Sequence, residues 1–286
     1  MAYALVNAVT LSDVHAAMSI ARSVLPHREA LLAGISALAD LEALYSLACF
    51  AAEQPVCCYP EPEAPARIEI EGGVHPLIAA ERVVGNAVAL HPGCRLWLIT
   101  GSNMAGKSTF LRMVGLCVLL AQAGSAVTAR RMRWSPARLI TDLRARDNLS
   151  ESESYFLSEV RHLRRLVLPP EGRAPILGLV DEPFRGTNSR DQSAASVAVL
   201  EHLLASPHLF LVATHDRHLT GLCDGRGGRN FHFRENLNAD GLVFDYRLHE
   251  GPARTRNALS ILEREGYPPE LVRRAREWPG DESDGV

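Results

Sequence analysis

Apolar residues recur along the chain at two different spacings, which predict a helical segment followed by alternating strands and helices. Over 11–53 the steps are of three and four residues, indicating two helices, the second long and opened by Pro26. Beyond this segment, short apolar runs predict strands at 68–71, 82–90, 95–100, 176–182 and 209–215, with one or two more between 232 and 248. The helices expected among them cover 110–120, a stretch ending near 165, 191–204 and 258–277. This alternation is typical of an α/β fold.

A proline-rich stretch separates the two patterns. Residues 54–65 include Pro55, Pro60, Pro62 and Pro65, which cannot lie inside a regular helix. We therefore predict a domain boundary here, with a helical segment at 1–54 and an α/β domain at 55–286.

The most apolar part of the helical segment, 31–52, is long enough to cross a membrane. Asp40 and Glu42 lie at its middle, however, where charges are costly in a bilayer. We therefore predict a helix packed on the body of the protein and no membrane partner. No charged and apolar leader opens the chain, and its six cysteines form no C-x-x-C pair, which together favour reduced thiols in a cytoplasmic protein.

The overall charge limits the kinds of partner. With 30 Lys and Arg against 33 Asp and Glu, the net charge of -3 argues against a strongly basic nucleic-acid-binding module. Contact with duplex DNA would then come from a local patch or from other parts of a larger protein. The basic run 130–134 could touch phosphate, but with so few charges a solvated turn is the favoured interpretation.

A glycine-spaced loop lies between a predicted strand and a predicted helix. It fits the phosphate-binding pattern G-x-x-x-x-G-K-[ST], in which backbone amides and the helix N-terminus bind the β- and γ-phosphates. Glycines allow the backbone to approach the phosphates, Lys107 reaches their oxygens, and Ser108 can ligate Mg²⁺. The predicted nucleotide-binding residues of this loop are Gly101, Ser102, Asn103, Met104, Ala105, Gly106, Lys107, Ser108 and Thr109.

Two further apolar strands end in residues suited to phosphoryl transfer, one in Asp181 and Glu182 and the next in His215. The carboxyl ends of strands are where ligands bind in α/β folds. We expect Asp181 to hold Mg²⁺ with Ser108, directly or through water. Glu182 would orient or deprotonate the attacking water, and His215 would contact the γ-phosphate. With Lys107, these groups predict ATP hydrolysis once a second copy closes the far side of the γ-phosphate, as in nucleotide-sandwich dimers.

Three segments together carry a resemblance to a known family. They are the phosphate loop with Asn103 and Met104 inside it, the acidic segment 181–187 with its Arg-Gly-Thr, and the Thr-His-Asp at 214–216. They are similar to the phosphate loop, second acidic motif and Thr-His switch of the MutS mismatch-repair ATPases. The resemblance covers about 39–275 and implies an ABC-type P-loop NTPase fold with a mixed central sheet, preceded at 1–54 by the end of a helical lever.

The same resemblance implies roles for residues outside these motifs. Ser154 falls on the MutS signature, whose serine faces the γ-phosphate held by the partner. Asn86 precedes the loop as in the family, and Tyr246 falls where an aromatic residue or a histidine packs on adenine. Val83 stands where an adenine-packing aromatic residue is common.

The function implied is that of the ATP-binding and ATP-hydrolysing module of a MutS-like DNA mismatch repair protein. It would form a homodimer, or pair with a MutS-like partner, through its ATPase face. Its nucleotide state would be coupled to double-stranded DNA, held largely by regions outside this chain, in the nucleoid-associated cytoplasm.

Two alternatives come from other classes. An ABC transporter ATPase subunit would be expected to carry a Leu-Ser-Gly-Gly-Gln-like signature, where this chain has Ser-Tyr-Phe at 154–156. A nucleotide-dependent interaction module without hydrolysis is the second, and the presence of Lys107, Asp181, Glu182 and His215 argues against it.

Overall fold

The chain divides into two units, Met1–Glu53 and Gln54–Val286. The computed structural model describes residues 2–102, 104–143, 155–169, 172, 174–223, 225–238, 241–253, 262–263 and 266–277. Each unit is described by itself below.

Helices make up nearly all of the described part of the first unit. Its elements are α1 (Ala2–Thr10), α2 (Ser12–Val24), the short 3-10 helix η1 (Leu25–His27) and α3 (Arg28–Glu53). Leu11, with a left-handed φ of 52°, separates α1 from α2, and η1 contains Pro26. The prediction of two helices over 11–53, the second long, is confirmed, with α1 as an additional helix.

The apolar side chains of α3 are exposed within this chain. None of the described residues of α2 or α3 is buried, and Leu31, Ile35 and Leu38 are each more than half exposed. The packing of this helix on the body of the protein stays a prediction. By length and composition alone the helical run Ser12–Glu53 could cross a membrane, which is weak evidence because helices of soluble proteins meet the same criterion.

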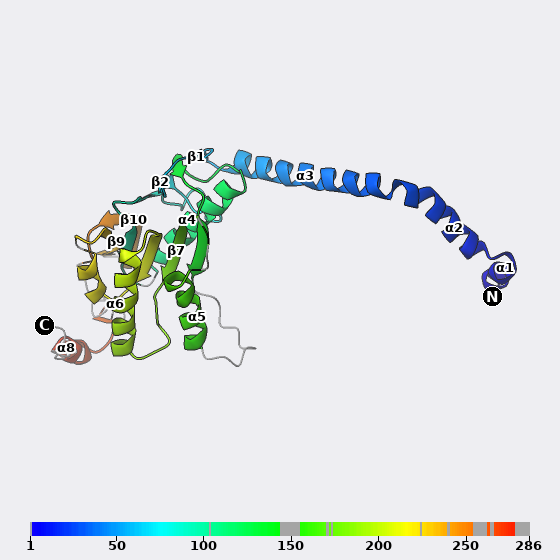
Figure 1. Ribbon diagram of the computed structural model, residues 1–286. Coiled ribbons are helices and arrows are strands. Elements are labelled where there is room, and N and C mark those ends of the chain that lie inside the picture. The colour runs from blue at the N-terminus through cyan, green and yellow to red at the C-terminus, as the bar shows by residue number, and fades with distance from the viewer. Residues whose placement is uncertain are drawn as a thin grey trace. The chain divides into compact units, whose positions relative to one another are not determined.

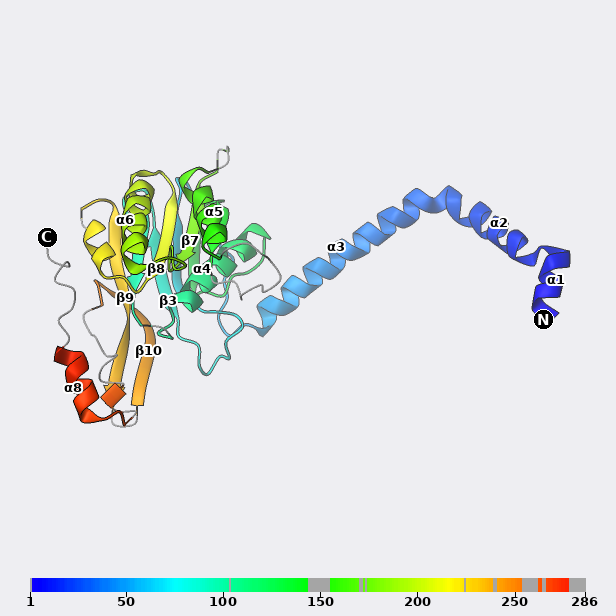
Figure 2. The same ribbon diagram turned by 90° about the horizontal axis from the view of Figure 1, so that it is seen from below.

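The main sheet of the second unit has six strands. Five of them are parallel to one another, and the edge strand β10 pairs antiparallel with β9, so the predicted mixed sheet is confirmed. In Figure 2, β9 and β10 form a long ribbon at the edge of the sheet. The order across the sheet is β10 (Gly241–Glu250), β9 (Gly228–Asn238), β4 (Leu96–Thr100), β8 (Leu209–Thr214), β7 (Ile176–Asp181) and β6 (Arg138–Asp142).

Helices cover both faces of this sheet, because alternate strand residues point to opposite sides. Trp97 and Ile99 belong to the apolar cluster around α4 (Lys107–Gln122), whereas Leu96 and Leu98 belong to the cluster on the other face. On that other face lie α5 (Tyr155–Val167) and α6 (Ser189–Ala205), side by side in Figure 1. The strands are thereby fixed between two apolar layers.

A second, smaller sheet has the order β1 (Glu61–Pro62), β5 (Arg131–Trp134), β2 (Ile68–Gly73) and β3 (Asn86–Leu90). The expected solvated turn at 130–134 is wrong, because this segment forms β5. Met132 and Trp134 are buried, while Arg133 pairs with Glu69 at 2.7 Å and Arg131 with Glu61 at 3.0 Å. The alternation of charged and apolar residues is that of a half-buried strand, and its arginines are compensated by glutamates.

One other expected element is shorter than predicted, and another lies partly outside the described residues. The strand expected at 82–90 begins only at Asn86, since the backbone N–H groups of Arg82 and Val83 donate to the carbonyl of Ala79 in a turn. Of the helical stretch expected at 258–277, most of the described residues lie in α8 (Pro269–Glu277). A short 3-10 helix, η2 (His218–Leu222), follows β8.

Candidate active site

The ends of three adjacent parallel strands place the predicted site residues at one edge of the sheet. β8 lies between β4 and β7, with Thr100 opposite Thr214 and Asp181 opposite Ala213. The phosphate loop follows β4, Glu182 follows β7 and His215 follows β8. Residues far apart in the sequence therefore meet because their strands are parallel and in register.

The phosphate loop has the backbone that its glycines predict. Gly101 and Gly106 have φ values of 143° and 110°, where a side chain is strained. A Cβ on Gly101 would also lie 3.0 Å from the carbonyl oxygen of Phe233. Ala105 is fully buried, and Asn103 lies outside the described residues.

Lys107 is the first residue of α4 and is buried over the loop, 4% exposed. Its ammonium donates to the carbonyl oxygens of Gly101 at 2.7 Å and Ser102 at 2.9 Å. Nζ also lies 4.0 Å from Oε1 of Glu182. The cation is thus held at the centre of the loop, within reach of the carboxylate that follows β7.

Ser108 and Asp181 meet directly, with the serine hydroxyl donating to Oδ2 at 2.5 Å. A hydroxyl and a carboxylate oxygen are hard ligands of the kind that Mg²⁺ prefers. No group of three or more His, Cys, Asp or Glu side chains suited to a metal occurs in the described part of the chain. This pair therefore fits Mg²⁺, which binds through few protein ligands and completes its shell with phosphate and water.

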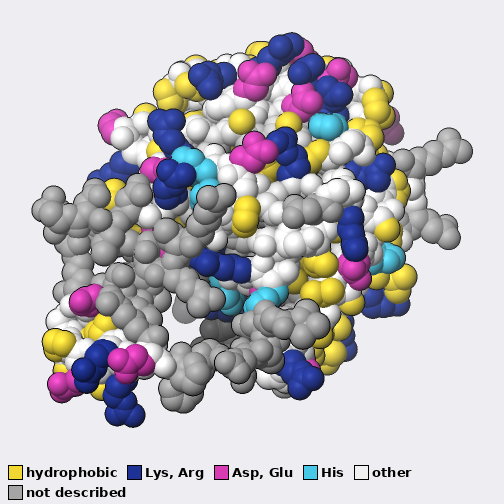
Figure 3. Space-filling model, turned by 90° about the vertical axis from the view of Figure 1, so that its left-hand side faces the viewer, with side chains coloured by type: hydrophobic (Ala, Val, Ile, Leu, Met, Phe, Trp, Pro, Cys, Tyr) yellow, Lys and Arg dark blue, Asp and Glu magenta, His cyan; other side chains and the backbone are white. Residues whose placement is uncertain are grey.

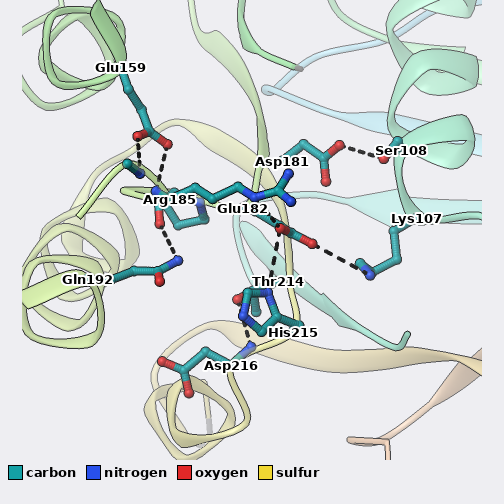
Figure 4. A network of polar contacts seen from close by, with 12 residues as sticks. Lys107, Ser108, Glu159, Asp181, Glu182, Arg185, Gln192, Thr214, His215 and Asp216 are labelled. Carbon is teal, nitrogen blue, oxygen red and sulfur yellow. Dashed lines mark hydrogen bonds and ion pairs between the residues drawn. The ribbon is translucent and has the colours of Figure 1, made fainter. Parts of the chain in front are cut away.

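Glu182 is surrounded by three basic side chains although its own side chain is only 1% exposed. Lys107 Nζ lies 4.0 Å from Oε1, while Arg185 Nε and His215 Nδ1 lie 3.6 Å and 3.5 Å from Oε2. Figure 4 shows all three directed toward the carboxylate. The hydrogen bond to Glu182 is the main cause that raises the pKa of His215 above its ordinary value.

The backbone at Glu182 is strained. Its φ of 61° is left-handed, as is the φ of 57° at Phe184. Its own N–H donates to the carbonyl of Ala213 at 2.8 Å, and the carbonyl of Pro183 accepts from Gln192 Nε2 on α6 at 3.2 Å. Non-glycine residues in this conformation concentrate at functional sites.

The segment after His215 is attached to α6. Asp216 accepts a hydrogen bond from the Ser193 hydroxyl at 2.6 Å, and its N–H donates to Thr214 Oγ1 at 3.0 Å. A second oxygen of Asp216 accepts from the N–H of His218 at 2.9 Å. These bonds fix the turn in which the histidine lies.

A pocket of about 290 Å³ borders the phosphate loop. Gly106, Val83, Phe233 and Tyr246 are among its lining residues. A Cβ on Gly106 would lie 3.4 Å from the Tyr246 ring, so the ring closely covers the loop. Tyr246 has a left-handed φ of 53° within an irregular stretch of the β9–β10 pairing.

Asn86 supports this pocket from outside the loop. Its Nδ2 donates to the carbonyl of Tyr246 at 2.9 Å, and its Oδ1 accepts from the N–H of Leu248 at 2.8 Å. These bonds join β3 to the irregular part of β10. The structure therefore gives Asn86 a role in holding Tyr246, and its direct contact with nucleotide stays a prediction.

Sequence reasoning missed Arg185 and Glu159 as site residues. Arg185 belongs to the segment that resembles the second acidic motif, but only the structure places its guanidinium beside Glu182. Glu159 contacts the same segment from α5. Ser154 lies outside the described residues, immediately before Tyr155 at the start of α5.

Comparison with known proteins agrees with this geometry. Residues 97–280 match the family model described as MutS domain V. The chain belongs to the MutS domain V family. It is also 36% identical over 249 residues to the DNA mismatch repair protein MutS of Natronomonas pharaonis, an alignment covering 85% of this chain and 29% of that protein. The chain thus spans less than a third of the relative's length.

Membership in MutS domain V confirms the resemblance and the α/β fold class predicted from the sequence. MutS domain V is an ATPase domain, so an ATP-binding site is expected at the phosphate loop. The transporter alternative is not supported, since the match to MutS covers most of the chain.

Proposed function

We propose that this MutS domain V binds ATP at 101–109 and hydrolyses it to ADP and phosphate. The observation that carries the proposal is the meeting of Lys107, Ser108, Asp181, Glu182 and His215 at the ends of three adjacent strands. The pocket beside Tyr246 is the proposed place of the adenine base. Its apolar lining and its position next to Gly106 suit a base joined to phosphates in the loop.

In the proposed reaction Glu182 orients a water molecule toward the γ-phosphorus and accepts its proton. The new bond joins the water oxygen to phosphorus, and the bond to the oxygen bridging the β- and γ-phosphates breaks. Lys107 neutralises negative charge on the β- and γ-oxygens, and His215 contacts the γ-phosphate. Phosphoryl transfer depends mostly on such positioning and charge neutralisation.

Lys107 must exchange partners when phosphate binds. Its ammonium is bonded to two loop carbonyls, and charge-assisted bonds to phosphate oxygens are stronger than bonds to neutral carbonyls. Ser108 and Asp181 would hold Mg²⁺, which supplies further neutralisation of phosphate charge when bound.

We further propose that the site is completed by a second copy, or by a MutS-like partner, meeting the domain at its ATPase face. The support is the resemblance of 154–159 to the MutS signature, which lies at the start of α5. In this arrangement Ser154 of one molecule faces the γ-phosphate held by the other.

The proposed role of this ATPase is to couple nucleotide state to DNA binding in a mismatch repair protein of the cytoplasm. The support is the similarity to the relative from Natronomonas pharaonis, which is named a DNA mismatch repair protein. On the face shown in Figure 3, Lys and Arg side chains are interspersed with Asp and Glu. Together with the net charge of -3, this supports assigning most of the DNA contact to regions outside this chain, with 1–54 as the end of the lever that would connect them.

Single-turnover hydrolysis tests the catalytic assignment. Glu182→Gln keeps the size of the side chain but cannot accept the water's proton, so the rate should fall by about 100-fold or more while ATP still binds. Glu201→Gln is the matched control, because Glu201 is an exposed residue of α6 paired with Arg226. Equal rates for wild type and Glu182→Gln would reject the catalytic role, whereas no hydrolysis by the wild type would favour the non-hydrolysing alternative.

Mixing two inactive variants tests the composite site. A Ser154→Ala molecule keeps its phosphate loop, and a Lys107→Ala molecule keeps its signature, so their mixed dimer should contain one working site. Recovery of ATPase activity on mixing is expected. Absence of recovery, together with a monomer in the presence of ATP, would reject the sandwich arrangement.

Contact with duplex DNA is tested by salt dependence. If the domain neutralises phosphates itself, the logarithm of the affinity should fall linearly with the logarithm of the salt concentration. A slope near zero would remove DNA as a direct partner of this domain.

A further inference from the structure

Glu159 takes no part in the proposed reaction, yet its carboxylate is buried beside the segment that carries Glu182. It is 6% exposed, and each of its oxygens accepts a backbone hydrogen bond. Oε1 accepts from the N–H of Arg185 at 3.0 Å and Oε2 from the N–H of Gly186 at 3.3 Å (Figure 4). A carboxylate that receives two successive N–H groups fixes the position of that backbone, because bonds to a charged acceptor are strong.

The segment that Glu159 holds needs such support. The left-handed conformations at Glu182 and Phe184 are strained and persist only where the surroundings determine them. Phe184 is buried in the apolar cluster beneath α5 and α6, and Gln192 holds the carbonyl of Pro183. Glu159 adds two bonds on the far side of the turn, three and four residues after Glu182.

The contact also joins two elements with different proposed tasks. Glu159 lies on α5, whose first residue directly follows Ser154 in the sequence, whereas Glu182 follows β7. We propose that Glu159 is a positioning residue that ties α5 to the loop holding Glu182. This inference rests on the proposed function.

In a dimer, this link makes the two sites depend on each other. Each ATP would be held by the phosphate loop of one molecule and faced by α5 of the other. A change at Glu182 in one molecule therefore shifts the helix that this molecule presents to its partner's nucleotide. The two proposed sites are connected through the hydrogen bonds from Arg185 and Gly186 to one carboxylate.

Glu159→Gln is the variant that isolates the contact. Glutamine has the same shape but only one acceptor oxygen, so its NH₂ group would face one of the two backbone N–H groups. Amide hydrogen exchange at Arg185 and Gly186 should become about 10-fold faster or more, because these N–H groups lose a charged acceptor. Glu201→Gln should leave this exchange unchanged, and unchanged exchange in Glu159→Gln would overturn the proposal.

Linked dimers then separate the effect on the same molecule from the effect on its partner. A Lys107→Ala molecule has no working site of its own and serves only by presenting α5. The reference dimer, Lys107→Ala with wild type, should hydrolyse ATP at about half the wild-type rate, since one of two sites works. An inactive reference dimer rejects the composite site of the proposed function, before Glu159 is tested.

Glu159→Gln is placed first in the wild-type half and then in the Lys107→Ala half of this dimer. Both placements should lower the single-turnover rate at saturating ATP by about 5-fold or more, with ATP affinity changed less than about 2-fold. In the second placement the substitution can act only through the α5 that its molecule presents to the partner's nucleotide. A purely local structural role of Glu159 would leave the rate of this dimer unchanged. Loss of rate in only one placement, or in neither, overturns the link.

Discussion

Asp142 lies at the end of β6 and gives the sharpest test of the electrostatics around the site. Its side chain is 16% exposed and lies 3.7 Å from Nδ1 of His162. Burial first, and then the nearby charge of Glu159, raise its pKa from 3.8 to about 6, although His162 acts in the opposite sense. Asp142→Asn should therefore stabilise the protein at pH 8, because it removes a buried negative charge.

The magnitude follows from the shift in pKa. The folded pKa lies above the unfolded one, so the contribution of this carboxyl to stability is complete below pH 3.8 and is lost as the pH rises through about 6. A difference of about 2 units corresponds to about 3 kcal/mol at pH 8, and to about half of that near pH 5. With a urea m-value near 3 kcal/mol/M, the midpoint should rise by about 1 M at pH 8.

Urea unfolding at pH 8 and pH 5, followed by tryptophan fluorescence, measures the effect in the second unit, where Trp97 and Trp134 are buried. Asp245→Asn is a control of opposite sign. Burial acts to raise the pKa of Asp245, but the N–H of Arg247 and the His249 side chain lower it overall, so this variant should lose stability at pH 8. A stabilisation of Asp142→Asn that is equal at both pH values, or a destabilisation at pH 8, would refute the reasoning.

Two further predictions concern the nucleotide site. Asn86→Ala removes two hydrogen bonds to β10 and should weaken ATP affinity about 10-fold, because Tyr246 is displaced. A fluorescent ATP analogue measures this affinity, and an unchanged value would contradict the supporting role of Asn86. In an NMR titration, the pKa of the His215 ring should lie above 6.5 and should return toward 6.5 in Glu182→Gln. The pairing of the protonated ring with Glu182 is complete below pH 6.5 and is lost as the pH rises through the raised pKa. A pKa that does not move in the variant would show that the glutamate is not its partner.

The sequence was sufficient for the phosphate loop and the residues that follow the central strands. Asp181 and His215 stand directly after apolar runs, and Lys107 ends the glycine-spaced loop that follows another, so their place at the sheet edge follows from the sequence pattern. The family likewise follows from short motifs whose chemistry requires particular residues at particular spacings.

The sequence was insufficient where a contact joins distant segments or where a strand is short. The four residues of β5 carry two arginines, so charge concealed the alternating burial of Met132 and Trp134. The bonds of Glu159 to Arg185 and Gly186 span 26 and 27 residues and depend on how α5 packs over the sheet. Nothing in the local pattern around Asn86 indicates bonds to residues 160 positions away.

The central place of β8 limits how the site can respond to its ligand. All six of its residues are buried, and it is paired along its length with β4 on one side and β7 on the other. Sliding this strand would break both ladders at once, so it serves as a rigid reference for the histidine beyond it. In the proposed function, a change in phosphate occupancy would therefore be expressed as ring rotation at His215 or as movement of the following turn, which Asp216 connects to Ser193 of α6.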